Sequence, residues 1–89
     1  MQVDRVITAL VERSAMSGRA ISAALGKSSA YVKTAARAGR SPALATVADV
    51  ADVVGVDVVL IDRETGATVC TVTPPRRADD LGDGADLIG

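Results

Sequence analysis

Residues 16–38 read MSGRAISAALGKSSAYVKTAARA, and this stretch decides the fold of the chain. Its pattern predicts a helix over 18–25, a tight turn at Gly26 and a second helix over 29–38. Ser17 can cap the helix over 18–25, because its hydroxyl can accept a hydrogen bond from a free N–H group of the first turn. Gly26 follows that helix at a position where a left-handed conformation is common, and glycine adopts it without strain.

The two predicted helices should pack against each other through small and branched apolar side chains. The expected buried residues are Ala20, Ile21, Ala24 and Leu25 on one helix and Val32, Ala35 and Ala36 on the other. Ala20 is small enough for the helices to cross closely, and Ser28 or Ser29 can cap the helix over 29–38. The outer face of that helix would carry Ser29, Ala30, Lys33, Thr34 and Arg37, with Tyr31 at its margin.

A further helix is expected on either side of this unit. Residues 3–14 form the first, with Val3, Val6, Ile7 and Leu10 at helical spacing, and Ser14-Ala15-Met16 is a short connection. Downstream, Ser41 is a suitable N-cap and Pro42 a suitable first residue for a helix that ends at Gly55. Its buried face would carry Leu44, Val47, Val50, Ala51 and Val54, with Asp49 and Asp52 on a solvated face.

After Gly55 the apolar spacing changes to one typical of strands. Residues 56–61 and 67–72 are rich in β-branched side chains and flank the five-residue loop 62–66, which ends in glycine. This pattern predicts a β-hairpin. Its second strand would place Ala67, Val69 and Thr71 on one face and Thr68, Cys70 and Val72 on the other. Because a lone hairpin is marginally stable in water, it should pack on the helices or pair with a second copy of the chain.

The 89 residues are enough for one small domain and too few for a second core. We expect a mainly α architecture: helices over 1–55, the hairpin within 56–73, and a disordered acidic tail over 74–89 that begins with two prolines. The apolar residues are mostly Ala and Val, and Tyr31 is the only aromatic residue. Such a core has little volume, so a dimer interface would help to stabilise it.

Composition argues against several classes of protein. The single Cys70 cannot form an intrachain disulfide, and a chain without histidine offers no obvious zinc site. No arrangement of nucleophile and base and no phosphate-binding glycine loop is visible, so we expect neither an enzyme nor a cofactor. The start lacks the pattern of a signal peptide, and no apolar run is long enough to span a bilayer. We therefore expect a soluble cytoplasmic protein.

The net charge of −1 conceals a marked segregation of charge along the chain. Residues 1–41 hold seven Lys and Arg against two acidic residues, a net charge of +5. Residues 42–75 have a net charge of −4 and residues 76–89 a net charge of −2. A basic first half indicates either a surface that faces a polyanion or ordinary solvated charge.

A short helix, a turn with glycine and a second helix of similar length are typical of the helix–turn–helix motif that reads DNA. Residues 16–54 resemble the lambda-repressor-like, or Cro-type, helix–turn–helix domain of the XRE family. The matching segments are Ser17–Gly26, Ser28–Thr34 and Arg40–Val56, the last with the Val-Gly-Val ending of the family's fourth helix. The chain departs from the family at Gly18, where a glutamine often contacts phosphate, and in having a hairpin where a fifth helix is common.

The resemblance implies a reading face on the helix over 29–38. The residues expected to contact bases are Ser29, Ala30, Lys33 and Thr34. Those expected to contact phosphates are Arg19, Lys27, Ser28, Tyr31, Arg37 and Arg40. Each could instead be an ordinary surface side chain, and Tyr31 could pack on the first helix. Because Ser29 and Ala30 are small, Lys33, Thr34 and the flanking arginines are expected to carry most of the binding.

Two hypotheses of function follow. The first is a sequence-specific, dimeric DNA-binding transcriptional regulator, a repressor of phage or prophage character that dimerises through the hairpin. The alternative is a protein-interaction module, or an antitoxin, that uses the same scaffold to bind a protein partner. The small residues Ser29 and Ala30 and the net charge of −1 favour the alternative, whereas Lys33 and Arg37 favour DNA.

Overall fold

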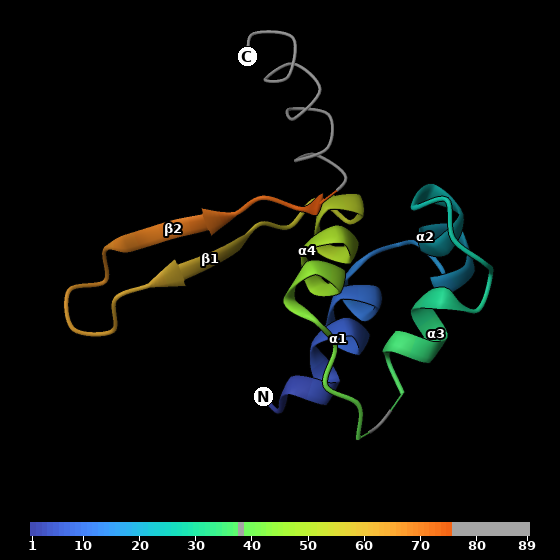
Figure 1. Cartoon of the computed structure of the whole chain (residues 1–89), viewed down its shortest axis with the longest axis horizontal. Coiled ribbons are helices and arrows are strands. Elements are labelled where there is room, and N and C mark those ends of the chain that lie inside the picture. Colours follow the sequence, from blue (N-terminus) through green and yellow to red (C-terminus); the bar gives the residue numbers. More distant parts are fainter. Residues whose placement is uncertain (38, 76–89) are drawn as a thin grey trace, which may run out of the picture.

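Helices occupy most of the first 55 residues, and a β-hairpin follows them (Figure 1). The computed structural model describes residues 1–37 and 39–75. Its elements are the 3-10 helix η1 (Val3–Arg5), the helices α1 (Val6–Arg13), α2 (Gly18–Ala24), α3 (Tyr31–Ala35) and α4 (Leu44–Val53), and the strands β1 (Val58–Ile61) and β2 (Thr68–Val72). The expectation of a mainly helical domain followed by a hairpin is confirmed. The predicted tail lies outside the described residues, apart from Pro74 and Pro75.

Each of the four α-helices contributes one fully buried branched side chain to the core. These side chains are Ile7, Ile21, Val32 and Val50, in chain order. Burying one such side chain stabilises the fold by about 1.5–3 kcal/mol. Leu10 and Ala51 complete the cluster, and Tyr31 is among the partly buried side chains that pack against it.

The turn between α2 and α3 forms as expected. The backbone N–H of Ala20 donates to the hydroxyl of Ser17 at 3.1 Å, which confirms Ser17 as the N-cap of α2. Gly26 has a φ of +70° and donates to the carbonyl of Ala23 at 3.0 Å. The next N–H, that of Lys27, donates to the carbonyl of Ser22 at 3.0 Å. This pair of bonds satisfies the last carbonyls of α2 and needs a left-handed residue at position 26.

The buried face of α2 differs from the expected one. Ala20 and Ala24 are exposed, whereas Ser22 is buried beside Ile21. Gly18, not Ala20, faces α3, because a methyl group added there would lie 3.5 Å from Cγ1 of Val32. The packing thus buries the face that contains a glycine and a serine hydroxyl, and it leaves the face with the two alanines exposed.

Helix α3 is shorter than predicted at both ends. It begins at Tyr31 with Ala30 as its N-cap, a residue whose side chain cannot cap it, so the expected capping by Ser28 or Ser29 is wrong. Instead, the N–H of Tyr31 donates to the carbonyl of Ser28 at 3.0 Å in a turn that precedes the helix. The helix ends at Ala35, and the predicted last residue, 38, lies outside the described residues.

Both flanking helices begin later than predicted. Helix α1 is preceded by the 3-10 turn η1, in which Val3 is 57% exposed and not part of the buried face. Helix α4 has Ala43 as an N-cap without a capping side chain, so Ser41 and Pro42 lie before the helix. Leu44 is consequently 54% exposed, contrary to expectation.

The end of α4 is as predicted, but its polar side is not fully solvated. Gly55 follows the helix with a φ of +78°, and the N–H of Val56 donates to the carbonyl of Ala51 at 2.8 Å. Asp49 and Asp52 are half-buried and engaged in further interactions, which corrects the expectation of a solvated face.

The hairpin extends away from the helices (Figure 1). Its strands are antiparallel, with Val58 opposite Val72 and Leu60 opposite Cys70. The register then shifts, so that Ile61 pairs with Thr68 and the expected strict alternation along β2 is interrupted at Val69. In the predicted loop, Oδ1 of Asp62 accepts from the N–H groups of Glu64 at 2.8 Å and Thr65 at 3.2 Å. Within the described part of the chain, no helix has the length and apolar character needed to cross a membrane.

Candidate functional site

Helix α3 is held in place from its inner side by the hydroxyl of Ser22. Oγ of Ser22 accepts from the N–H of Val32 at 3.1 Å and donates to the carbonyl of Gly18 at 2.8 Å. Val32 is the second residue of α3, so its N–H has no partner within the helix. Ser22 therefore supplies, from the neighbouring helix, the capping contact that Ser28 and Ser29 do not make.

The opposite side of this segment is open. All four residues predicted to contact bases, Ser29, Ala30, Lys33 and Thr34, are exposed. Only Lys33 and Thr34 belong to α3, because Ser29 and Ala30 lie in the turn before it. The structure thus brings the four residues to one continuous segment, with the smallest side chains at its leading end.

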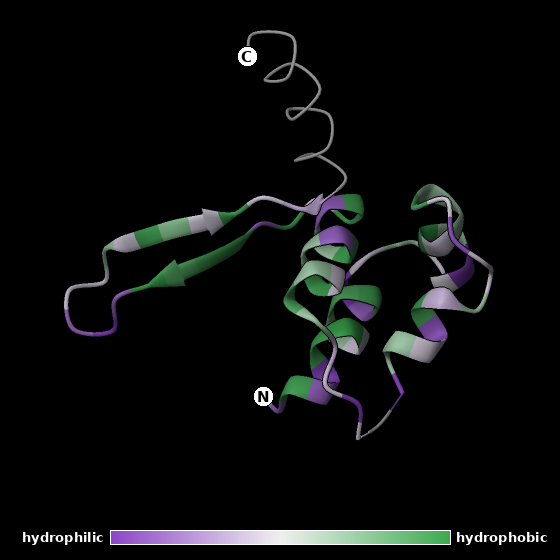
Figure 2. Cartoon of the chain, viewed as in Figure 1, coloured by the Kyte–Doolittle hydropathy of each residue, from purple (hydrophilic) through white to green (hydrophobic). Residues whose placement is uncertain are grey.

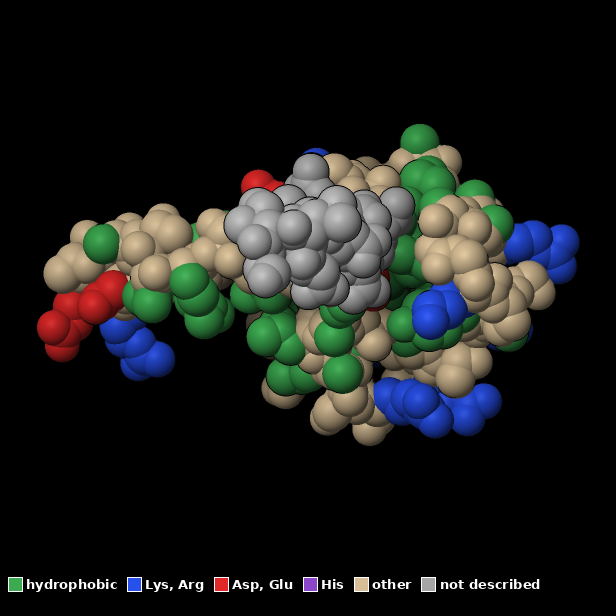
Figure 3. Space-filling model, turned by 45° about the horizontal axis from the view of Figure 1, so that its top comes forward, with side chains coloured by type: hydrophobic (Ala, Val, Ile, Leu, Met, Phe, Trp, Pro, Cys, Tyr) green, Lys and Arg blue, Asp and Glu red, His purple; other side chains and the backbone are tan. Residues whose placement is uncertain are grey.

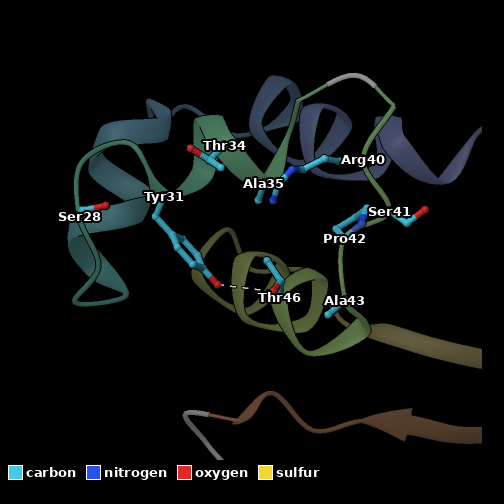
Figure 4. A pocket seen from close by; sticks show the side chains of 9 residues that line it. All are labelled: Ser28, Tyr31, Thr34, Ala35, Arg40, Ser41, Pro42, Ala43 and Thr46. Carbon is cyan, nitrogen blue, oxygen red and sulfur yellow. Dashed lines mark hydrogen bonds between the residues drawn. The ribbon is translucent and has the colours of Figure 1, made fainter.

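A hollow lined by both polar and apolar side chains lies on one flank of α3 (Figure 4). We call it the α3–α4 pocket; it has a volume of about 430 Å³ and is lined by Ser28, Tyr31, Thr34, Ala35, Arg40, Ser41, Pro42, Ala43 and Thr46. Three of the residues predicted to contact phosphate, Ser28, Tyr31 and Arg40, meet here. Hydroxyl groups and a guanidinium can all donate hydrogen bonds to an anion.

Tyr31 bridges the two walls of this pocket. Its side chain is half-buried, and its hydroxyl donates to Oγ1 of Thr46 in α4 at 3.5 Å. The ammonium of Lys27 lies 5.6 Å from the centre of the Tyr31 ring, within the range of a cation–π contact. Tyr31 thus combines a position in the pocket with a packing role toward α4, a contact that the sequence did not reveal.

A second hollow lies on the other flank of α3. We call it the α1–α3 groove; it has a volume of about 540 Å³ and is lined by Thr8, Val11, Glu12, Gly18, Arg19, Ser29, Val32, Lys33 and Ala36. It brings Arg19, predicted to contact phosphate, next to Ser29 and Lys33, predicted to contact bases. Glu12 adds one carboxylate to the same groove. Helix α3 therefore forms a ridge between two hollows that both contain cationic side chains.

Charge is distributed unevenly over the surface. In the view of Figure 3, Lys and Arg side chains gather around the end of the molecule opposite the hairpin, and acidic side chains lie at the tip of the hairpin beside a basic one. Arg19, Lys27, Lys33, Arg37 and Arg40 are all exposed. The segregation seen along the sequence is thus also a segregation in space.

Asp4 fixes the loop that carries Arg40. Its Oδ2 accepts from the N–H of Gly39 at 2.9 Å, which joins η1 to the connection between α3 and α4. Gly39 has a φ of +82°, and the N–H of Arg40 donates to the carbonyl of Arg37 at 3.1 Å. Asp4 and Gly39 lie 35 residues apart, and nothing in their spacing predicted this contact.

Residues 1–37 and 39–75 contain no group of His, Cys, Asp or Glu side chains that could hold a metal ion. Comparison with known proteins adds no relative: no family model, no curated protein and no solved structure matches the chain.

Proposed function

We propose that this protein is a sequence-specific DNA-binding transcriptional regulator, a Cro- or repressor-type protein of phage or prophage character. In this proposal α2, the turn and α3 act as the helix–turn–helix unit of a lambda-repressor-like domain. The supporting observation is the ridge of α3, which is anchored by Ser22 on its inner side, open on its outer side, and flanked by two hollows with cationic side chains.

The ridge has the side chains that base recognition needs. The major groove of B-DNA is about 12 Å wide and admits a helix. Lys33 can donate to O6 and N7 of guanine, Thr34 can donate or accept, and the methyl group of Ala30 can contact thymine. Ser29 can donate or accept at the leading end. The small side chains at this end let the backbone approach the bases closely.

The two flanks suit the two phosphate backbones that border a major groove. The α3–α4 pocket offers Arg40 and several hydroxyl groups to one strand, and Arg19 at the α1–α3 groove faces the other. Lys27 and Arg37 extend the cationic surface beyond the ridge. Such contacts set the register of the protein without reading sequence. Two copies on a near-palindromic operator would insert their α3 helices about 34 Å apart.

A binding experiment tests this proposal. The full chain is titrated against DNA from the region upstream of its own gene and against a scrambled duplex of equal composition. We expect preferential binding of the upstream DNA and a steep fall in affinity with salt. Equal binding of both duplexes, or no binding at low salt, would contradict the proposal. Selection of bound sequences from a random DNA pool gives the half-site and its spacing.

The alternative, a protein-interaction module or antitoxin, is favoured by one observation. The hairpin exposes large apolar side chains, with Ile61 at 61% and Val69 at 67% exposure. A protein that co-purifies stoichiometrically with the chain and protects Lys33 from chemical modification would support this alternative over DNA binding.

A further inference from the structure

The α1–α3 groove has an apolar floor and a charged rim. Val32 is buried in the floor, and Val11 and Ala36 are partly buried beside it. Arg19 and Lys33 are exposed at the rim. In Figure 2, α1 and α3 each combine hydrophobic residues (green) with hydrophilic ones (purple). Such a groove suits a short chain that carries both large apolar side chains and carboxylates, because each part finds its own partner.

The α3–α4 pocket on the other flank lacks this combination. Among the described residues that line it, Arg40 is the single charged one, and none is a valine, leucine or isoleucine. The α1–α3 groove has two valines and two cations, against the one carboxylate of Glu12. The groove is therefore the better site for an acidic and apolar ligand.

The end of the sequence has the composition that the groove requires. Residues 78–89 read ADDLGDGADLIG and contain four aspartates and no basic side chain. Asp86, Leu87 and Ile88 are consecutive, and Leu87 and Ile88 are the one pair of adjacent large apolar residues in this segment. Burial of the two apolar side chains and attraction between carboxylates and cations would act together.

The chain is also long enough to reach the groove. Val72, near the end of the described chain, pairs with Val58 at the base of the hairpin, and Val58 packs against the helical core. Figure 1 shows β2 running back from the hairpin loop toward the helices. Ile88 is 13 residues beyond Pro75, the last described residue. Because 13 extended residues span roughly 43–47 Å, they exceed the 40 Å length of the molecule's longest axis.

We propose that residues 83–89 dock in the α1–α3 groove of their own chain. Leu87 and Ile88 lie on the apolar floor, and Asp86 faces the cationic rim formed by Arg19 and Lys33. A short tether gives such a segment an effective concentration on the order of millimolar. Even a contact with a Kd of about 1 mM is then formed in about half of the molecules.

The docked segment competes with DNA, and this consequence rests on the proposed function. Ser29 and Lys33, which are assigned to base contacts, both line the groove. DNA binds only those molecules whose groove is open, so the apparent affinity falls in proportion to the open fraction. The end of the chain thus acts as an autoinhibitory segment that only a well-matched DNA site displaces readily.

A zero-length cross-link tests the docking without DNA. A carbodiimide joins a carboxylate to an amine with which it is in contact, and Lys27 and Lys33 are the only lysines of the chain. Both are exposed, but Lys27 does not line the groove. We expect the full chain to link residues 78–89, which trypsin releases as one peptide, to Lys33 in preference to Lys27. Mass spectrometry identifies the linked peptides.

The key variant is Leu87→Ser, and Leu81→Ser is its matched control. Both remove a leucine that follows an aspartate in the same segment, and neither changes the charge. We expect Leu87→Ser to lower the yield of the link to Lys33 about fivefold, because a tenfold weaker contact lowers the docked fraction from about one half to about one tenth. Leu81→Ser should keep the yield. Both positions lie beyond the described residues, so neither substitution alters the described core.

The same two variants test the competition with DNA. We expect Leu87→Ser to bind DNA about twofold more tightly than the wild type if about half of the molecules are docked, and about tenfold more tightly if about nine in ten are. Leu81→Ser should bind like the wild type. Because Leu87→Ser changes no charge, a gain in affinity reports the loss of docking and not a weaker repulsion between aspartates and phosphates.

Three outcomes would overturn the docking. One is equal linking to Lys27 and Lys33, the second is an unchanged yield in Leu87→Ser, and the third is a link that joins isotope-labelled to unlabelled chains in a mixture, which would assign the groove to a second copy. The two proposals can also fail separately. A link to Lys33 without any DNA binding would contradict the proposed function alone, and specific DNA binding without the link would contradict the docking alone.

Discussion

The hydroxyl of Ser22 connects α2 to α3, and it is the only polar side chain in the buried interior of the described residues. The O–H group of Ser22 donates to the carbonyl of Gly18, and its oxygen accepts from the N–H of Val32. Both bonds are needed, because a buried polar group without a partner costs free energy. The oxygen atom of Ser22 therefore contributes, together with the packing of Val32, to the orientation of α3 and of the ridge.

Replacing Ser22 should test this dependence. We expect Ser22→Ala to lower the free energy of unfolding by about 1–3 kcal/mol, because it leaves the buried N–H of Val32 without an acceptor. Thermal and denaturant unfolding measure the change. Ser28→Ala is the matched control, since Ser28 is exposed and does not cap α3, and it should alter stability by less than about 0.5 kcal/mol. Equal effects of the two substitutions would show that Ser22 has no special structural role.

Two exposed cations near the ridge should behave differently toward DNA. We expect Lys33→Ala to reduce discrimination between the preferred site and single-base variants by about 1–3 kcal/mol at one position. Arg37→Ala should instead weaken binding to all DNA sequences alike. It should also make the slope of log affinity against log salt concentration shallower by about 0.9. Fluorescence anisotropy at several salt concentrations measures both quantities. Identical profiles for the two variants would contradict the assigned roles.

At the scale of elements, the hairpin is stabilised chiefly by its own loop and ladder. The carboxylate of Asp62 accepts two backbone N–H groups, and its own N–H donates to the carbonyl of Ala67 at 2.9 Å. The helices form a separate set of contacts, which the hairpin shares only at its base. Changes in the loop should therefore affect the hairpin more than the helices.

Hydrogen exchange can separate these two parts. We expect Asp62→Ala to increase exchange of the amides in β1 and β2 and to leave those of α1 and α4 unchanged, because the lost bonds are local to the loop. Glu64→Ala is the control: it changes the charge by the same amount, and only the backbone N–H of Glu64 takes part in the bonds of Asp62. Uniformly faster exchange throughout the chain would show instead that hairpin and helices unfold as one unit.

For the whole molecule, the small core makes each buried side chain important. Val50 is fully buried where α4 meets the other helices, whereas Leu44, at the start of the same helix, is 54% exposed. Small domains have a total stability of about 5–15 kcal/mol, so the loss of one core side chain is a substantial fraction.

Two truncations to alanine on α4 should show this contrast. We expect Val50→Ala to cost about 2–3 kcal/mol, through lost burial and the cavity left behind. Leu44→Ala should cost less than about 0.5 kcal/mol, although leucine is the larger side chain. Denaturant unfolding provides the comparison. A larger loss for Leu44→Ala would mean that this residue is covered in solution, as in an assembly of two copies.

The sequence alone determined the local structure of this protein. The apolar spacing, the serine at position 17, the glycines at 26 and 55 and the loop before Ala67 predicted the order and type of the elements, because caps, turns and periodicity depend on neighbouring residues. The exposure of Lys33, Thr34 and Arg37 was predictable for the same reason. The helix starts at Tyr31 and Leu44 were not, since Ser28, Ser29 and Ser41 each offered a plausible cap that the chain does not use.

Only the tertiary structure decided which face of each helix is buried and which distant groups meet. On helix α2 the buried face contains Gly18 and Ser22 and the exposed one Ala20 and Ala24, so packing against Val32 and the bonds of Ser22 decide the buried face. The contacts of Asp4 with Gly39 and of Tyr31 with Thr46 join residues far apart in the chain. No local preference encodes such contacts, because they exist only once the helices have packed and placed α3 as a ridge between two hollows.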